Sequence, residues 1–139
     1  MRVLIDTNVI LDFLLNREEF VEEARSLFKE VAYNRITAYC TATTLTNIFY
    51  ISRRHTQSIE QARQAVVLVL SIMEICSVDR ALLESALTSA LTDFEDAVQV
   101  ASALGEGLDA IVTRDAGLQS ALIPVMSIRQ ILEQLEADK

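Results

Sequence analysis

Apolar and polar positions alternate along the chain with two different periods. Short apolar runs predict buried strands at residues 3–6, 36–40, 74–78 and 109–113. Longer segments repeat apolar residues every three or four positions and predict amphipathic helices at residues 8–15, 19–33, 44–53, 57–71, 79–89, 93–104 and 127–135. Short apolar strands separated by helices are typical of a parallel sheet that is covered on both faces. We therefore expect an α/β fold, a three-layer sandwich with a central parallel sheet of four or five strands flanked by helices.

Length and composition favour one domain over residues 1–139, because 139 residues with 51% apolar content can build a single hydrophobic core. Three glycines and one proline leave no linker or low-complexity tract. The longest uncharged stretch, residues 36–52, is too polar for a bilayer helix, and the apolar run before Asp6 is too short for a signal peptide. We expect a cytoplasmic protein with no membrane contact.

Net charge limits the kinds of ligand that the surface can hold. The chain has 20 acidic and 12 basic residues, which gives a formal charge of −8. Nonspecific electrostatic binding of a phosphate backbone is therefore excluded. A local acidic site could still bind a phosphodiester if a divalent cation lay between carboxylates and phosphate.

Acidic residues follow predicted strands at the edge of the sheet where ligands of such folds bind. Asp6 ends the first strand, and Asp115 follows the fourth. Asp93 and Asp96 open a predicted helix, and Asn47 lies early in the helix that follows the second strand. These residues are distant in sequence, and the predicted topology brings Asp6, Asp96 and Asp115 close together in space.

Each acid also has a structural interpretation. Asp6 and Asp115 are ordinary turn formers, and an aspartate in the first turn of a helix satisfies free backbone amides. Thr92 and Glu95, however, fit a capping box, which would leave Asp93 and Asp96 free to face the crevice. Several carboxylates that converge repel one another unless a cation holds them, and an oxygen-only ligand set favours Mg²⁺.

Four segments together resemble the PIN domain family, the nuclease fold of many bacterial toxins; in chain order they are LIDTNVILD, TTLTNIFYI, DFEDAVQVASA and AIVTRD. The resemblance covers nearly the whole chain. It implies a ribonuclease dependent on Mg²⁺ or Mn²⁺, often a homodimer and often paired with a small antitoxin. Carried onto this sequence, it makes Asp6, Asp96 and Asp115 the catalytic, metal-binding acids, with Asp93 as a neighbour that assists them.

The polar neighbours of these acids follow from the same resemblance. Thr7, Asn8 and Thr113 match the residues that surround the acids, and we expect Thr113 and Asn8 to hold them by hydrogen bonds. Arg114 adjoins Asp115, and it either contacts RNA or pairs with an acid.

Asn47 stands where many PIN domains have a glutamate, as in a subgroup of the family that carries TLTN. An amide oxygen is a weaker ligand than a carboxylate for a hard dication, so we expect lower metal affinity. Two functions follow. The first is a metal-dependent endoribonuclease, the toxin of a toxin–antitoxin pair. The second is a catalytically weakened PIN-like module that binds RNA or a partner protein.

Overall fold

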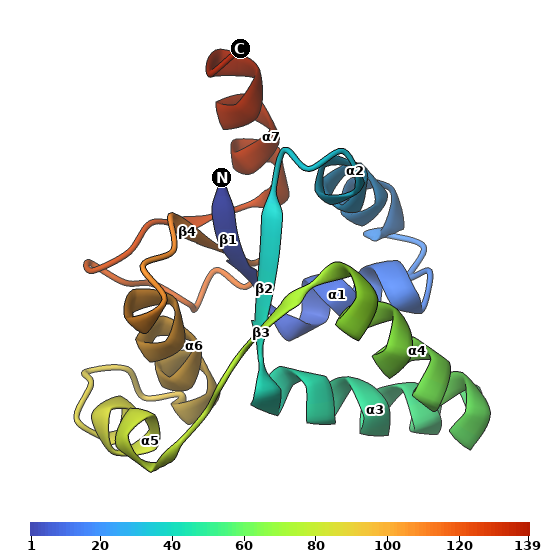
Figure 1. The fold of residues 1–139 in the computed structure, drawn as a ribbon, viewed down its shortest axis with the longest axis horizontal. Coiled ribbons are helices and arrows are strands. Elements are labelled where there is room, and N and C mark those ends of the chain that lie inside the picture. Colours follow the sequence, from blue (N-terminus) through green and yellow to red (C-terminus); the bar gives the residue numbers. More distant parts are fainter.

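A parallel five-stranded sheet forms the centre of the computed structural model, which describes all 139 residues (Figure 1). The strands are β1 Arg2–Ile5, β2 Thr37–Thr41, β3 Glu74–Cys76, β4 Ala110–Val112 and β5 Val125–Met126. They lie in the order β3-β2-β1-β4-β5, and every neighbouring pair is parallel. The predicted fold class is confirmed, and the fifth strand is the two-residue β5.

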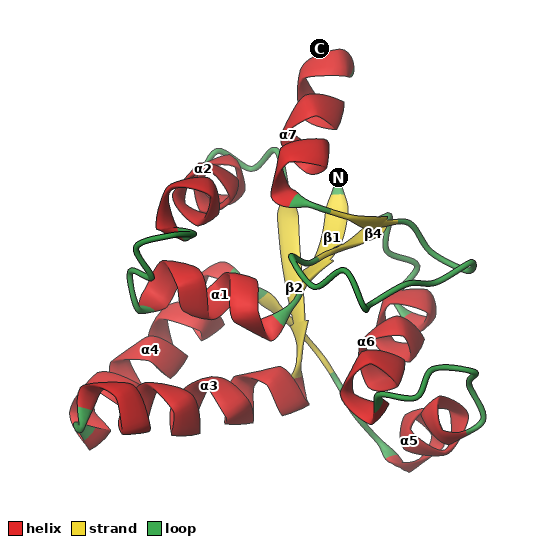
Figure 2. Cartoon of the chain, turned by 180° about the vertical axis from the view of Figure 1, so that it is seen from behind, coloured by secondary structure: helices red, strands yellow, loops and turns green.

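Helices cover both faces of this sheet (Figure 2). They are α1 Thr7–Leu14, α2 Val21–Ala32, α3 Ala42–Thr56, α4 Ile59–Ile72, α5 Arg80–Leu87, α6 Phe94–Gly105 and α7 Ile128–Ala137. Helices α1 to α4 and α7 pack on one face, and α6, with α5 against it, packs on the other. No helix has the length and apolar character that crossing a bilayer requires.

The central strand β1 explains why the two layers form. Val3 and Ile5 belong to the larger apolar cluster beneath α1 to α4 and α7, whereas Leu4 belongs to the smaller cluster beneath α6. Side chains alternate between the faces of a strand, so a strand covered on both faces must be apolar at every position. All three side chains are fully buried.

One edge of the sheet collects the polar residues of interest. Because the strands are parallel, β1, β2 and β4 all end at this edge, and Ile5 pairs with Val112 there. Asp6 follows β1 directly and caps α1, and Thr41 ends β2 and caps α3. Thr113 follows β4. Helix α6 brings its first turn to the same edge, which places a set of acids together.

Candidate functional site

Asp6 is a buried carboxylate, 7% exposed, at the carboxyl end of β1. Its Oδ1 accepts hydrogen bonds from the backbone N of Thr7 at 2.8 Å and from Nε2 of Gln99 at 3.1 Å. Its Oδ2 accepts from Oγ1 of Thr113 at 2.7 Å. Burying a charge is costly unless it is hydrogen-bonded, and these three donors offset that cost. They also fix the direction of both oxygens.

Thr113 links Asp6 to Asp115. Its Oγ1 donates to Asp6 and accepts from the backbone N of Asp115 at 3.0 Å. The Asp115 side chain in turn accepts from the backbone N of Gly117 at 2.8 Å, which closes a tight turn. A Cβ at position 117 would lie 3.1 Å from Asp115 Oδ1, so a glycine leaves this carboxylate room to approach the backbone.

The first turn of α6 differs from the predicted capping box. Asp93, not Thr92, is the N-cap, and its Oδ1 accepts from the backbone N of Asp96 at 3.0 Å. Aspartate is a slightly better N-cap than threonine, and the helix therefore starts one residue later than the box required. Glu95 then occupies the second helical position and cannot reach back to the cap. Asp93 thus has a structural task that the sequence analysis gave to Thr92.

Asp96 shows that the acids converge. Burial raises the pKa of its carboxyl to about 6, and the negative charges of Asp93, Asp6, Asp115 and Glu95 add to that rise. The structure therefore brings Asp6, Asp96 and Asp115 within electrostatic range of one another. None of these five acids forms an ion pair with a lysine or arginine of the chain. No ion pair therefore offsets the negative charge of the site, although Arg114 lies within electrostatic range of Asp6.

These residues fit a hard divalent cation by their chemistry. The charged groups around Asp96 are all carboxylates, which offer oxygen ligands, with no histidine or cysteine among them. No group of three or more His, Cys, Asp or Glu side chains is arranged to hold an ion by itself. Mg²⁺ usually binds through one or two carboxylates and completes its shell with water or substrate oxygen. A group of converging carboxylates meets that requirement.

Arg114 points away from the acids and pairs with Asp12 of α1. Its Nε and Nη2 lie 2.8 Å and 3.2 Å from the two oxygens of Asp12, which is only 1% exposed, and Arg17 contacts the same carboxylate at 3.2 Å. The guanidinium also lies 3.9 Å above the ring of Phe20. The hydrogen bond to Asp12 raises the pKa of Arg114 further. Of the two roles expected for Arg114, the structure shows pairing with an acid, and that acid is Asp12 and not Asp115.

Asn8 does not contact the acids, contrary to expectation. Its side chain is exposed, and its Oδ1 accepts from Nη1 of Arg17 at 3.1 Å. Asn8 is the second residue of α1, and its side chain points outward, whereas the side chain of Thr7, the first residue of α1, is buried and faces the site. The Thr7 hydroxyl lies between Oγ1 of Thr44 at 3.0 Å and Oε1 of Glu95 at 3.2 Å.

Comparison with known proteins identifies the family. The profile described as "PIN domain" matches residues 2–117. This chain belongs to the PIN domain family. Comparison with curated protein sequences finds no match.

Solved structures with the same fold come from several bacteria. VapBC2 from Rickettsia felis, bound to a promoter DNA fragment, is 14% identical with a TM-score of 0.68, and the match covers 91% of this chain and 98% of that one. VapC20 from Mycobacterium tuberculosis, described as a Sarcin-Ricin loop cleaving toxin, is 15% identical with a TM-score of 0.67, over 82% and 90%. VapBC-1 from nontypeable Haemophilus influenzae is 14% identical with a TM-score of 0.66, over 93% and 99%.

Sequence reasoning missed two residues of the PIN domain site. Glu95 was assigned to a cap, yet its Oε1 accepts from Nδ2 of Asn47 at 3.4 Å as well as from Thr7. Gln99, which holds Asp6, was not singled out. It lies three residues after Asp96, on the same face of α6, and that spacing was the signal that could have found it.

The raised pKa of Asp96 predicts a pH-dependent stability. The folded carboxyl has a pKa of about 6 against 3.8 for an unperturbed aspartate, so the folded state binds more protons between these values, and stability falls as pH rises through them. Asp96→Asn removes this cost. Without metal, we expect the variant to exceed the wild type at pH 8 by about 1 kcal/mol, discounted for partial exposure. The gain should fade as pH falls from 6 towards 4.

Urea unfolding in EDTA at pH 4.5 and pH 8 measures this difference. Asp138→Asn, an exposed aspartate after α7, is the matched control and should give no pH-dependent gain. An Asp96→Asn gain that is the same at both pH values would contradict the electrostatic explanation.

The buried charge of Asp12 predicts a large effect of its removal. Asp12→Asn leaves two arginines without their acid, and we expect the free energy of unfolding to drop by about 3 kcal/mol. The exposed Arg80–Glu84 pair gives the comparison, since Glu84→Gln should cost less than about 1 kcal/mol. Urea unfolding in low and high salt tests both. Equal, salt-sensitive losses in the two variants would show that the Asp12 pairs behave as surface pairs.

Proposed function

We propose that this PIN domain is an endoribonuclease that hydrolyses phosphodiester bonds of cytoplasmic RNA with Mg²⁺ or Mn²⁺. The observation that carries the proposal is the convergence of Asp6, Asp96 and Asp115 at one edge of the sheet, where none of them forms an ion pair with a cation of the chain. Carboxylates in such an arrangement have lower energy when a divalent ion joins them. The VapC20 relative, described as a cleaving toxin, supports the same class of reaction.

The chain's own groups would hold the ion and orient the substrate. Thr113 and the backbone N of Thr7 fix the oxygens of Asp6, the backbone N of Gly117 fixes Oδ1 of Asp115, and Asp96 completes the acidic set. Gln99 holds Asp6 from the side of α6. A bound ion would supply the charge that activates water and stabilises the phosphoryl oxygens. Arg114 contributes by holding the segment next to Asp115 through its pair with Asp12.

A partner protein is part of this proposal. Two of the solved relatives are VapBC complexes, so we propose that an antitoxin binds this chain. We also propose that two copies of the chain form a homodimer. A mostly apolar hollow of about 560 Å³ between α3, α4 and β3 supports a partner surface. Tyr50 and Leu70 in this hollow are each more than half exposed, and apolar surface of this kind is usually covered in a complex.

RNA cleavage by the purified protein tests the main proposal. Single-stranded and structured RNAs are incubated with Mg²⁺ or Mn²⁺, with EDTA as the metal-free arm. We expect cleavage by the wild type and by the surface control Asp138→Asn, and a loss of at least about 100-fold in Asp6→Asn and Asp96→Asn. Equal activity in all four preparations would identify a contaminating nuclease.

A second candidate function rests on Asn47, because the site has an amide where many PIN domains have a carboxylate. In this case the domain binds RNA or a partner protein without efficient cleavage. RNA binding by the wild type with no metal-dependent cleavage would favour this function over the first.

The position of Glu95 predicts that α6 supplies the negative charge that α3 lacks at Asn47. Its carboxylate lies against the Asn47 amide, so we expect it to contribute to ion binding. Glu95→Gln should reduce the rise in melting temperature that Mn²⁺ gives the wild type. The exchange variant Asn47→Glu/Glu95→Gln should restore it, because the charge returns to the same place from α3.

Melting temperatures are measured over a Mn²⁺ titration. Glu133→Gln, an exposed position on α7, is the matched control. If Glu95→Gln responds to Mn²⁺ as the wild type does, Glu95 is not part of the ion site.

A further inference from the structure

A second hollow, separate from the one between α3, α4 and β3, adjoins the acidic site. Most of the residues that line it have no role in the proposed hydrolysis. It has a volume of about 470 Å³ and lies between the segment after β4 and the strand β5 with the residue that follows it. It shares Thr113 and Asp115 with the acidic site, so the two are continuous. Volumes between about 300 and 1,000 Å³ are typical of sites for small organic groups.

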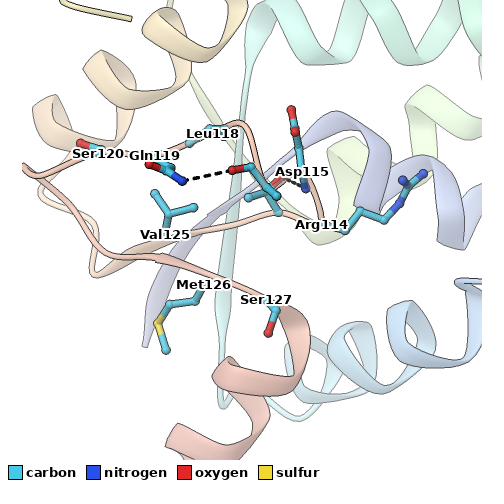
Figure 3. A pocket seen from close by; sticks show the side chains of 10 residues that line it. Arg114, Asp115, Leu118, Gln119, Ser120, Val125, Met126 and Ser127 are labelled. Atoms are coloured by element: carbon cyan, nitrogen blue, oxygen red, sulfur yellow. Dashed lines mark hydrogen bonds between the residues drawn. The ribbon is translucent and has the colours of Figure 1, made fainter.

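The charge of this hollow excludes a phosphate as its occupant. Arg114 is the only cationic residue in its wall, and its guanidinium is bound to Asp12 and stacked on Phe20. Figure 3 shows that guanidinium directed away from Gln119 and Val125. Asp115 at the mouth of the hollow adds a negative charge. A phosphate here would meet an acid and no free cation, which is unfavourable.

The remaining wall suits a flat, uncharged group with polar edges. Leu118 and Val125 supply apolar surface, and Gln119 lines the same hollow (Figure 3). The only hydrogen bond of the Gln119 amide is a long one, from Nε2 to the carbonyl of Ala116 at 3.4 Å. A side-chain amide carries two N–H donors and one oxygen acceptor, so Gln119 can hydrogen-bond the edge of a ligand that has both an acceptor and a donor. Nucleobases combine such an edge with an apolar face.

We infer that this hollow is a nucleobase subsite, which holds the base next to the phosphate that lies against Asp115. Gln119 hydrogen-bonds the edge of the base, and Val125 with Leu118 contacts its face. The inference rests on the proposed ribonuclease function, and it gives that function a source of sequence preference. The acidic site binds the backbone through the ion, which is the same for every nucleotide, so discrimination must come from a neighbouring surface of this kind.

Nucleoside binding tests the subsite without any cleavage. The ¹⁵N-labelled protein is titrated in EDTA with adenosine, guanosine, cytidine and uridine, and with inorganic phosphate as the charged comparison. We expect at least one nucleoside to shift the side-chain amide of Gln119 and the backbone amides of Val125 and Asp115 in a saturable way, and phosphate to shift none of them. Shifts confined to α3 and α4, no shift with any nucleoside, or equal shifts with phosphate would overturn the inference.

Two variants of Gln119 sharpen the test. Gln119→Ala should weaken nucleoside binding about fivefold, the factor that one hydrogen bond contributes. Gln119→Glu keeps the acceptors and removes the donors, so it should change which base binds best. Gln134→Ala, an exposed glutamine on α7, is the matched control and should bind as the wild type does. Unchanged binding in both Gln119 variants would overturn the role of Gln119.

Cleavage mapping separates the subsite from the ribonuclease proposal. On an RNA of mixed sequence, Gln119→Ala should change the distribution of cleavage positions, whereas Asp6→Asn should remove cleavage at all positions. If no preparation cleaves RNA but nucleosides still bind beside Gln119, the ribonuclease proposal fails and the subsite stands. If the wild type cleaves and Gln119→Ala keeps the same positions with the same relative yields, the subsite fails and the ribonuclease proposal stands.

Discussion

The structure depends on keeping one charged carboxylate, that of Asp6, buried at the edge of a parallel sheet. An unpaired charge in that position would cost several kcal/mol, roughly enough to cancel much of the stability of a small domain. The offsetting donors come from the backbone of α1, from Gln99 on α6 and from Thr113 after β4. Both helical layers and a neighbouring strand therefore meet at this carboxylate, and the geometry of the site is tied to the packing of the whole fold.

The two buried aspartates are balanced in different ways, and the difference separates scaffold from site. Asp12 pairs with two arginines, and one of them, Arg114, lies two residues after the carboxyl end of β4. Asp6 accepts hydrogen bonds only from neutral donors, while burial and the neighbouring acids raise the pKa of Asp96. A chain with a net charge of −8 thus uses two arginines to pair with Asp12 and leaves the converging acids without an ion pair. That lack is the physical basis for assigning an ion to them.

Sequence periodicity was enough to predict the layers, because β4 and β1 from Val3 onward are buried on both faces and read as apolar runs. It could not predict β5, because a strand of two residues is too short to show a periodic pattern. The cap of α6 was assigned one residue early, because Thr92 and Asp93 are both good caps and the sequence alone does not choose between them. The pairing of Asp12 with Arg114 spans 102 residues, and no local pattern reports a contact of that range.

A contact between helices also changes the interpretation of Asn47. In the sequence, the Asn47 amide stands where many PIN domains have a glutamate, and the substitution removes a negative charge from the site. In space, Glu95 of α6 lies against that amide, and its charge is among those that raise the pKa of Asp96. Electrostatic energy depends on where a charge lies and not on which helix carries it. A motif compared position by position counts a loss at residue 47, whereas the folded chain has a carboxylate within 3.4 Å of that side chain.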